Sequence, residues 1–252
     1  IWQQAEELKD EMVERRRDLH RHPETGWTEF RTASMIIGEL KKLGYDVKFG
    51  ADVIDEKSMM GVPSEAELVD YMQRAINEGA DPELVKKMAG GKTGIVATLK
   101  TDKPGKTVAF RFDMDCNDVE EERCDEHRPA KEGFASEHKK AMHACGHDGH
   151  VTIGLSAAKL LAANKARLAG TVKLIFQPAE EGVRGAHAIV ENGWLDDADA
   201  LLASHVAPTG KADDGDVTVG TWGSLATTKY DVAFTGRAAH AGGFPEQGKN
   251  AL

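Results

Sequence analysis

The chain has 252 residues, 40% of them hydrophobic and 29% charged, and its formal net charge is −10. This length allows one large α/β domain or two domains on one chain. The acidic balance argues against nucleic acid or an anionic membrane surface as the main partner. No apolar run approaches the roughly 20 residues that are needed to span a bilayer, so no membrane segment is expected.

The three cysteines, Cys116, Cys124 and Cys145, form no Cys-x-x-Cys pair. A disulfide framework is therefore not expected, and a reducing, cytoplasmic compartment is favoured. The sequence starts at Ile1 with neither an initiator Met nor a basic-then-apolar signal pattern, so we expect further residues before it.

Helix-like and strand-like segments alternate as far as residue 204. Apolar residues at helical spacing predict helices at 5–19, 28–43, 65–77, 83–88, 152–163 and 185–191. Runs of β-forming residues predict strands at 45–49, 94–99, 107–112, 171–176 and 198–204. Because residues 103–106 have the composition of a turn, the two strands that flank them are expected to be adjacent. The alternation is typical of an α/β sheet covered on both faces.

Two stretches depart from this alternation. The mostly polar segment 50–91 is interpreted as an insertion or lid. After Pro208 the composition of the sequence changes again, and strand-like segments within 217–235 are separated by glycines. We therefore expect a first domain at 1–215 and the start of a second at 216–252, beginning near Gly215 or Thr218 and incomplete at the end of the chain.

A Cys-x-His pair lies in the histidine-rich segment 142–150. Cys145 and His147 occupy a turn of small residues that leads into a predicted helix, and a thiolate and an imidazole at this spacing can reach one metal ion or two adjacent ones. A buried structural cysteine beside a histidine-rich helix start would give the same pattern. The pair alone does not decide between the two interpretations.

Three further polar positions follow predicted strands. Glu180 and Glu181 come after the strand at 171–176, His205 after the strand at 198–204, and Asp113 and Asp115 after the strand at 107–112. Functional groups in open α/β sheets gather at the carboxyl ends of strands. Acidic residues at a solvated helix start would explain the glutamates alone, but the convergence of all four positions predicts a metal-dependent hydrolase.

The order of these motifs resembles that of a known family. The sequence is similar to the amidohydrolase branch of the aminoacylase-type metallopeptidases, which includes auxin-conjugate hydrolases, hippurate hydrolases and N-acyl-amino-acid deacylases. The segments that carry the resemblance are LHRHPE at 19–24, DMD at 113–115, HACGHDGH at 143–150, FQPAEEG at 176–182 and GRAAHAGG at 236–243. The similarity extends over essentially the whole chain.

The resemblance implies a mixed-sheet α/β catalytic domain that holds two divalent metal ions and is interrupted by a smaller α/β dimerisation domain, truncated here. The family's metal ligands fall on four positions of this sequence, Cys145, His147, Glu181 and His205, and Cys145 is the expected bridging ligand. The family's last ligand, a histidine, would lie beyond Leu252. The thiol favours Zn²⁺, whereas the carboxylates and the family favour Mn²⁺.

Catalytic roles are implied for further residues. Glu180 falls on the general base and Asp115 on the carboxylate that orients the metal site. His240 falls on a histidine that stabilises the amide oxyanion in the active site of the neighbouring subunit. Asn250 falls on an asparagine that helps to hold the substrate carboxylate. A surface histidine and a helix-capping asparagine are the alternative interpretations of these last two.

The resulting hypothesis is a metal-dependent amidohydrolase that cleaves the amide between an acyl or aroyl group and an amino acid, such as an aminobenzoyl-glutamate. The alternative is a general N-acyl-amino-acid deacylase or dipeptidase, which turnover of aminobenzoyl-glutamate against acetyl-amino acids would distinguish. A non-catalytic structural partner is the alternative of another class, and it would be marked by degraded ligands. The expected partners are the small-molecule substrate and a second protein chain, identical or related, in a dimer.

Overall fold

The computed structural model describes residues 1–206, 215, 217–218, 220, 223, 226–228, 230 and 232–251. The chain divides into two compact units, Ile1–Ala212 and Asp213–Leu252, and each is considered by itself. The expected assignment of a first domain at 1–215 and a second at 216–252 stays a prediction.

A five-stranded mixed sheet forms the centre of the first unit. The strands are β1 (Asp46–Phe49), β2 (Ile95–Lys100), β3 (Thr107–Asp113), β4 (Thr171–Gln177) and β5 (Ala200–Ala203), in the order β1-β2-β4-β3-β5. β3 pairs in parallel with both β4 and β5, whereas β2 is antiparallel to β1 and β4. The prediction of a mixed-sheet α/β fold is confirmed.

The prediction that the strands at 94–99 and 107–112 are adjacent is wrong, because β4 lies between them. Six of the seven residues of β4 are buried, so this apolar strand takes the central position. The turn at 103–106 does not close a hairpin; instead Lys103 and Lys106 accept backbone hydrogen bonds from Gly170 and Thr171 at the start of β4.

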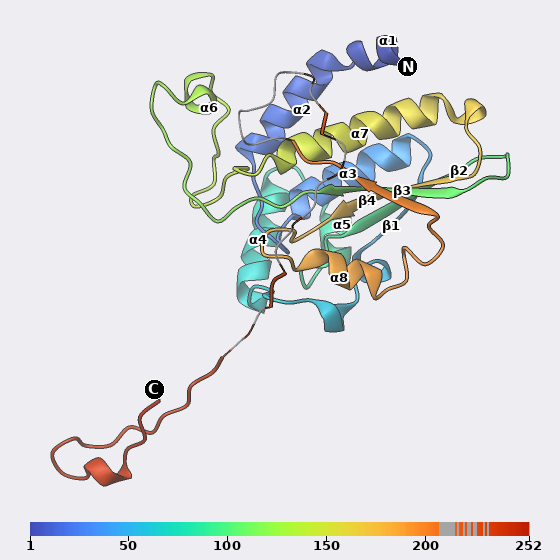
Figure 1. The fold of residues 1–252 in the computed structure, drawn as a ribbon. Helices are drawn as coiled ribbons and strands as arrows, with labels where there is room; N and C mark the ends of the chain where they lie inside the picture. The colour runs from blue at the N-terminus through green and yellow to red at the C-terminus, as the bar shows by residue number, and fades with distance from the viewer. Residues whose placement is uncertain are drawn as a thin grey trace. The chain divides into compact units, whose positions relative to one another are not determined.

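Helices cover both faces of the sheet (Figure 1). Side chains of β4 alternate between two hydrophobic clusters, with Leu174 and Phe176 in one and Ile175 in the other. The first cluster is completed mainly by α3 (Phe30–Lys42) and α7 (His147–Ala163), and the second contains Ala188 and Ile189 of α8 (Gly185–Val190). The expected covering of both faces follows from this alternation.

Two helices differ from their predicted bounds by more than two residues. The helix expected at 5–19 is two helices, α1 (Trp2–Glu6) and α2 (Lys9–Arg21). The helix expected at 152–163 begins earlier, at His147, because Gly146 takes a left-handed conformation with φ of 85° and starts the first turn there. The polar residues of that turn hide the helix from a search for apolar periodicity.

The segment 50–91 is not a detached lid. It forms α4 (Glu65–Asn77), which starts with a capping box at Ser64, and α5 (Pro82–Lys87), and both helices pack on α3. Leu68, Ala75 and Val85 are buried in the same hydrophobic cluster as α3. A short helix α6 (Arg128–Lys131) lies in the loop between β3 and α7.

The second unit contains an antiparallel bridge between Arg237 and Lys249 and a 3₁₀ helix over Pro245–Gln247. Parts of the strand-like region expected at 217–235 lie outside the described residues, and its described residues form no strand. Within the described ranges, no helix combines the length and the apolar character needed to cross a membrane.

Candidate metal centre

The polar positions that the sequence singled out meet at one edge of the sheet. β3 ends at Asp113, which is paired with Gln177 at the end of β4, and β5 runs parallel to both and ends at Ala203. The carboxyl ends of these three parallel strands therefore lie together, as in other open α/β sheets. The chain continues from them into Asp115, Glu180, Glu181 and His205.

Five side chains form the metal cluster, as we call Cys145, His147, Glu180, Glu181 and His205. Potential ligand atoms of Cys145, His147 and His205 lie within 4.8 Å of one another, and so do those of His147, Glu180 and Glu181. The Sγ of Cys145 is 3.3 Å from Nε2 of His205. The Nε2 of His147 is 3.8 Å from a carboxylate oxygen of each glutamate. His147 thus belongs to both groups.

Backbone carbonyls orient the two histidines of the metal cluster. The Nδ1 of His147 donates to the carbonyl oxygen of Asp115 at 2.7 Å, and the Nδ1 of His205 donates to that of Val206 at 2.6 Å. Because a carbonyl can only accept, both rings carry a proton on Nδ1, which leaves Nε2 as the nitrogen whose lone pair the neutral ring can offer to the cluster. This arrangement fixes the tautomer that ligates a metal ion.

His150 supports these rings and is engaged at both of its own nitrogens. Its Nε2 accepts the backbone N–H of Val206 at 3.0 Å, so its Nδ1 carries the proton and donates to Asp113. The ring stacks on that of His147, with centroids 5.2 Å apart, and meets the edge of His205 at 4.5 Å. Although Asp113, His147 and His150 also lie close together, His150 has no lone pair left for a metal ion.

Asp115 holds the loop that carries the glutamates. Its two carboxylate oxygens accept the backbone N–H groups of Glu180 and Glu181, each at 2.9 Å, and its side chain is fully buried. Through its backbone oxygen the same residue also orients His147. One buried carboxylate therefore connects both groups of the metal cluster.

Glu29 is a second support, which no sequence pattern indicated. One of its oxygens accepts the N–H of Ala179 at 2.8 Å, and the other accepts the hydroxyl of Thr93 at 2.6 Å. Ala179 has a left-handed φ of 47°, which is unusual for a residue with a Cβ, and it directly precedes Glu180. Burial, together with the charge of Asp115, raises the pKa of Glu29 to about 8.

Asn117 is another support that the sequence did not reveal, since its Oδ1 accepts the backbone N–H of Cys145 at 3.0 Å. Neither Glu29 nor Asn117 belongs to a ligand-type spacing. Both residues lie near segments that carry the resemblance to the family. This position in the sequence does not show which groups their side chains contact.

The crowding of acidic groups in the metal cluster is compatible with a bound cation. Burial and the charge of Glu181 raise the pKa of the Cys145 thiol to about 12, and burial and the charge of Asp113 raise the pKa of Glu180. Burial would lower the pKa of His147, but the hydrogen bond to Asp115 and the nearby carboxylates raise it to about 9. Crowded acidic groups hold protons in the absence of a cation, and a divalent ion favours their ionised forms.

Two buried atoms of the cluster indicate that a ligand fits there. The Nε2 of His147 and the Oε1 of Glu181 have no hydrogen-bond partner within the described part of the chain. Buried polar atoms are almost always paired, so unpaired ones that face each other indicate a binding site. Thiolate, imidazole and carboxylate are ligands of Zn²⁺ and its neighbours among the divalent metals.

The comparison with protein families agrees with this geometry. The sequence pattern of peptidase family M20/M25/M40 matches residues 109–243. The chain belongs to this family. It is 51% identical over 246 residues to an indole-3-acetyl-aspartic acid hydrolase of Enterobacter agglomerans, covering 98% of this chain and 56% of the relative. It is 50% identical to one subunit of p-aminobenzoyl-glutamate hydrolase of Escherichia coli, covering 94% and 54%.

Two solved structures resemble the fold as well. An aminobenzoyl-glutamate utilization protein from Klebsiella pneumoniae shares 42% identity and a TM-score of 0.67 over 81% of this chain and 45% of that one. A dinuclear metal-binding M20 peptidase from Bacillus subtilis shares 29% identity and a TM-score of 0.58, over 81% and 44%. The chain spans about half the length of the curated relatives that it matches.

His240 and Asn250 belong to the second unit. The Nδ1 of His240 accepts the N–H groups of Gly242 at 3.2 Å and Gly243 at 2.9 Å, so its proton is on Nε2 and the ring presents a donor. The helix start expected near Asn250 is not found among the described residues, where Asn250 lies in irregular structure. The roles of both residues stay predictions.

Proposed function

We propose that the protein is a metal-dependent amidohydrolase that cleaves the bond between an acyl or aroyl group and an amino acid. The observation that carries this proposal is the metal cluster itself, in which the ligand atoms of Cys145, His147 and His205 lie within 4.8 Å of one another, as do those of His147, Glu180 and Glu181. Membership of the M20/M25/M40 peptidases supports hydrolysis of an amide or peptide bond.

Cys145, His147, Glu181 and His205 would hold two divalent ions, Mn²⁺ or Zn²⁺. A dinuclear relative supports two ions. When bound, the ions act as Lewis acids that polarise the amide carbonyl and acidify the attacking water. The residues of the chain then have to place the substrate and move the protons.

Glu180 is the general base in this proposal. Its neighbour Glu181 is committed to the metal, whereas Glu180 is half-buried and lies 3.8 Å from both Nε2 of His147 and a guanidinium nitrogen of Arg111. Burial raises its pKa, which makes its carboxylate a better proton acceptor. Glu180 would take the proton of the attacking water and deliver it to the leaving nitrogen, while Asp115 holds its backbone in place.

The Nε2–H of His240 would stabilise the oxyanion in the active site of a neighbouring protomer, and Asn250 would help to hold the substrate carboxylate. The donor tautomer of His240 supports the first role. We propose that the partner is an identical or related chain, since the Escherichia coli relative is named as one subunit of its enzyme. Three free thiols support a reducing, cytoplasmic compartment.

The substrate class follows from the two relatives at about 50% identity. Their names describe an indole-acetyl group on aspartate and an aminobenzoyl group on glutamate. Both are aryl-containing acyl groups on an acidic amino acid. We therefore propose this class, with p-aminobenzoyl-glutamate as the first candidate.

The experiment is a turnover assay combined with metal analysis of protein purified without chelator. We expect about two divalent ions per chain, and faster hydrolysis of p-aminobenzoyl-glutamate and indole-3-acetyl-aspartate than of acetyl-amino acids. Turnover should be lost with a chelator and return with Mn²⁺ or Zn²⁺. Equal rates on acetyl-amino acids would point to a general deacylase, and full activity without metal would refute the proposal.

A further inference from the structure

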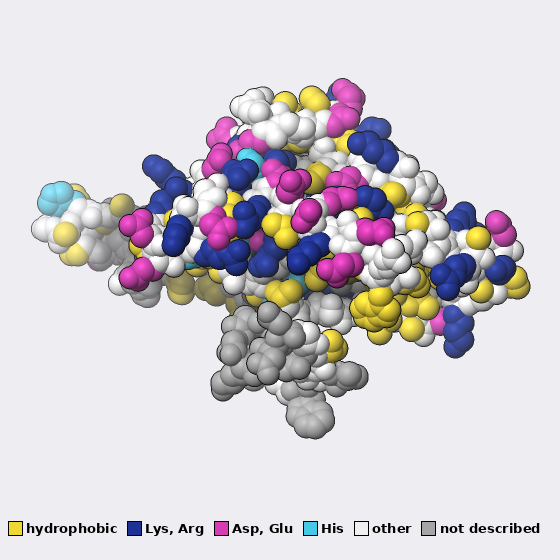
Figure 2. Space-filling view, turned by 90° about the horizontal axis from the view of Figure 1, so that it is seen from above, with side chains coloured by type: hydrophobic (Ala, Val, Ile, Leu, Met, Phe, Trp, Pro, Cys, Tyr) yellow, Lys and Arg dark blue, Asp and Glu magenta, His cyan; other side chains and the backbone are white. Residues whose placement is uncertain are grey.

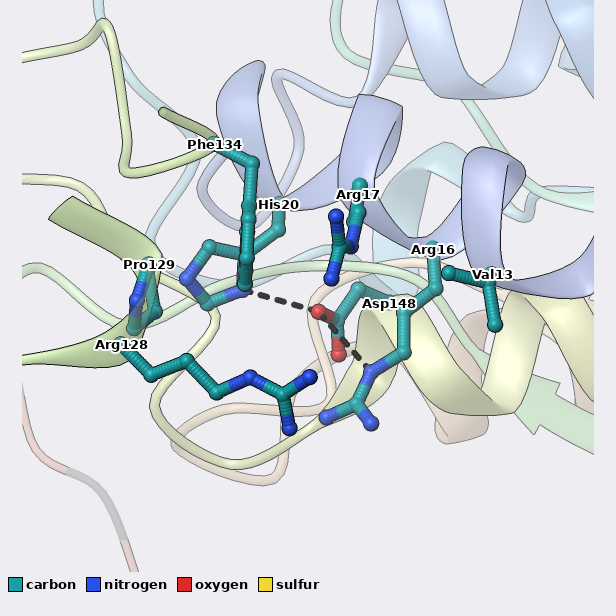
Figure 3. A pocket seen from close by; sticks show the side chains of 8 residues that line it. All are labelled: Val13, Arg16, Arg17, His20, Arg128, Pro129, Phe134 and Asp148. Carbon is teal, nitrogen blue, oxygen red and sulfur yellow. Dashed lines mark hydrogen bonds and ion pairs between the residues drawn. The ribbon is translucent and has the colours of Figure 1, made fainter. Parts of the chain in front are cut away.

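A hollow whose lining includes no residue of the metal cluster lies between α2, the start of α7 and the loop around α6. Its volume is about 330 Å³, and Figure 3 shows its lining. We call it the arginine hollow, and it is formed by Val13, Arg16, Arg17, His20, Arg128, Pro129, Phe134 and Asp148. Nothing in the proposed reaction uses it.

One face of α2 supplies half of this lining. Val13, Arg16, Arg17 and His20 follow the spacing i, i+3, i+4, i+7, which places four side chains along one side of a helix. Arg128 reaches toward them from the opposite wall, as Figure 3 shows. Three guanidinium groups therefore border one cavity in a chain whose net charge is −10. On the face that Figure 2 shows, acidic and basic side chains are interspersed.

The charges inside the chain do not fully occupy these arginines. Glu132 accepts from Arg17 at 2.5 Å and from Arg128 at 2.6 Å. Arg16 reaches Asp148 only through Nε, at 3.4 Å, and Asp148 also binds His20 at 2.9 Å. Three guanidinium groups thus share two carboxylates. The contact with Glu132 also shows that Arg17 and Arg128 are spaced to hold one carboxylate between them.

The remaining wall is apolar and aromatic. Phe134 is overlain by the guanidinium of Arg17, whose central carbon is 4.6 Å from the ring centroid, and it meets the ring of His20 edge-on at 5.6 Å. These contacts limit the freedom of Arg17 and Phe134 before any ligand binds. Val13 and Pro129 add further apolar surface.

We propose that the arginine hollow binds a small aromatic carboxylate. The carboxylate would pair with Arg16 and Arg128, whose planar guanidinium groups match its geometry. The aromatic body would lie against Phe134, Pro129 and Val13. Glu132 acts as an internal competitor, because it occupies part of the guanidinium groups of Arg17 and Arg128.

The test uses benzoate as the probe and isothermal titration calorimetry on the metal-loaded protein. Benzamide, which has the same shape without the charge, should bind at least tenfold more weakly than benzoate, and inorganic phosphate should also bind more weakly. Arg16→Gln and Arg128→Gln should each weaken benzoate binding about five- to tenfold. Arg167→Gln is the matched control, since Arg167 is an exposed arginine far along the sequence in the turn after α7, and it should leave the affinity unchanged.

Two further variants distinguish binding in the arginine hollow from binding at the metal cluster. Glu132→Gln removes the competing carboxylate and should tighten benzoate binding several-fold, an effect that a merely structural role of Glu132 would not produce. Glu181→Gln disables the metal cluster, where a carboxylate could also bind, and should leave the benzoate affinity of the hollow unchanged. Loss of binding in Glu181→Gln, equal binding of benzamide or phosphate, or no response to Arg16→Gln and Arg128→Gln would overturn the proposal.

Discussion

The metal cluster and the residues behind it both contain carboxylates and imidazoles. The two regions differ in how many of these polar atoms have hydrogen-bond partners within the protein. Behind the cluster, both carboxylate oxygens of Asp115 and of Glu29 accept hydrogen bonds from the protein, and both ring nitrogens of His150 are engaged. In the cluster, Nε2 of His147 and Oε1 of Glu181 are buried without a partner in the described structure.

This difference distinguishes residues that hold the site in shape from residues that are available to bind a ligand. A polar group that is fully paired within the chain contributes to rigidity and has no capacity left for a ligand, whereas a buried unpaired group costs stability and is kept where a ligand pairs it. Histidine and acidic residues alone therefore do not identify a metal site. The unpaired Nε2 of His147 and Oε1 of Glu181, which lie 3.8 Å apart, support the proposed site because two potential ligand atoms face each other there.

Among the variants of the metal cluster and of the residues behind it, we expect Glu180→Gln to have the largest effect on turnover. The substitution preserves shape but removes the proton acceptor, so turnover should fall by about 10²–10⁴-fold while metal content is retained. Glu181→Gln is the matched control, since it should lose metal together with activity. Metal analysis and turnover on p-aminobenzoyl-glutamate give both readouts. Activity within about threefold of wild type would place the base elsewhere.

His240→Ala asks whether the metal cluster is sufficient on its own. Loss of an oxyanion donor should lower turnover by about 10²–10³-fold with metal content unchanged. Asn250→Ala should mainly raise KM for substrates with a free α-carboxylate. Mixed dimers of Glu181→Ala and His240→Ala protomers should recover part of the activity, because one hybrid site receives both intact halves. No recovery in demonstrated hybrids would exclude action across the interface.

Asp115→Asn tests whether the hydrogen bonds from Asp115 hold the loop of Glu180 and Glu181 in place. An amide cannot accept both backbone N–H groups of Glu180 and Glu181, so the loop should shift and both metal affinity and turnover should fall by about 10- to 100-fold. Asp118→Asn, which changes an exposed neighbour in the same way, is the control. Chelator competition measures the affinity. An unchanged affinity would show that the loop is held by other contacts.

Glu29→Gln should have the smallest effect on turnover, less than about tenfold, because the amide mimics the protonated acid that a pKa of about 8 favours at neutral pH. Since burial raises this pKa above its ordinary value of 4.5, the folded state binds the proton more tightly than the unfolded state. Stability from Glu29 is therefore fully present below pH 4.5 and is lost as pH rises through about 8.

Urea unfolding in the presence of a chelator measures this dependence. The unfolding free energy of the wild type should decline relative to that of Glu29→Gln between about pH 5 and 8, with a slope of up to about 1.4 kcal/mol per pH unit. Parallel curves for the two proteins would mean that Glu29 is ionised in the folded state.

Much of this protein could be predicted from its sequence. Periodicity and β-forming runs predicted the α/β class and the positions of all five strands, since these signals are local. Glu180, Glu181 and His205 were expected at strand ends and Cys145 and His147 at a helix start, and the carboxyl ends of parallel strands meet at one edge. Cys145, His147, Glu180, Glu181 and His205 were proposed as site residues without tertiary information.

Only the tertiary structure decided the strand order, the packing of segment 50–91 on α3 and the roles of Glu29, Asn117 and His150. Each depends on contacts between residues far apart in sequence, such as Glu29 and Ala179, and no local period records which partner a buried carboxylate will find. The same holds for the arginine hollow, where the face of α2 is visible in the sequence but Arg128 and Phe134 are brought to it by folding alone.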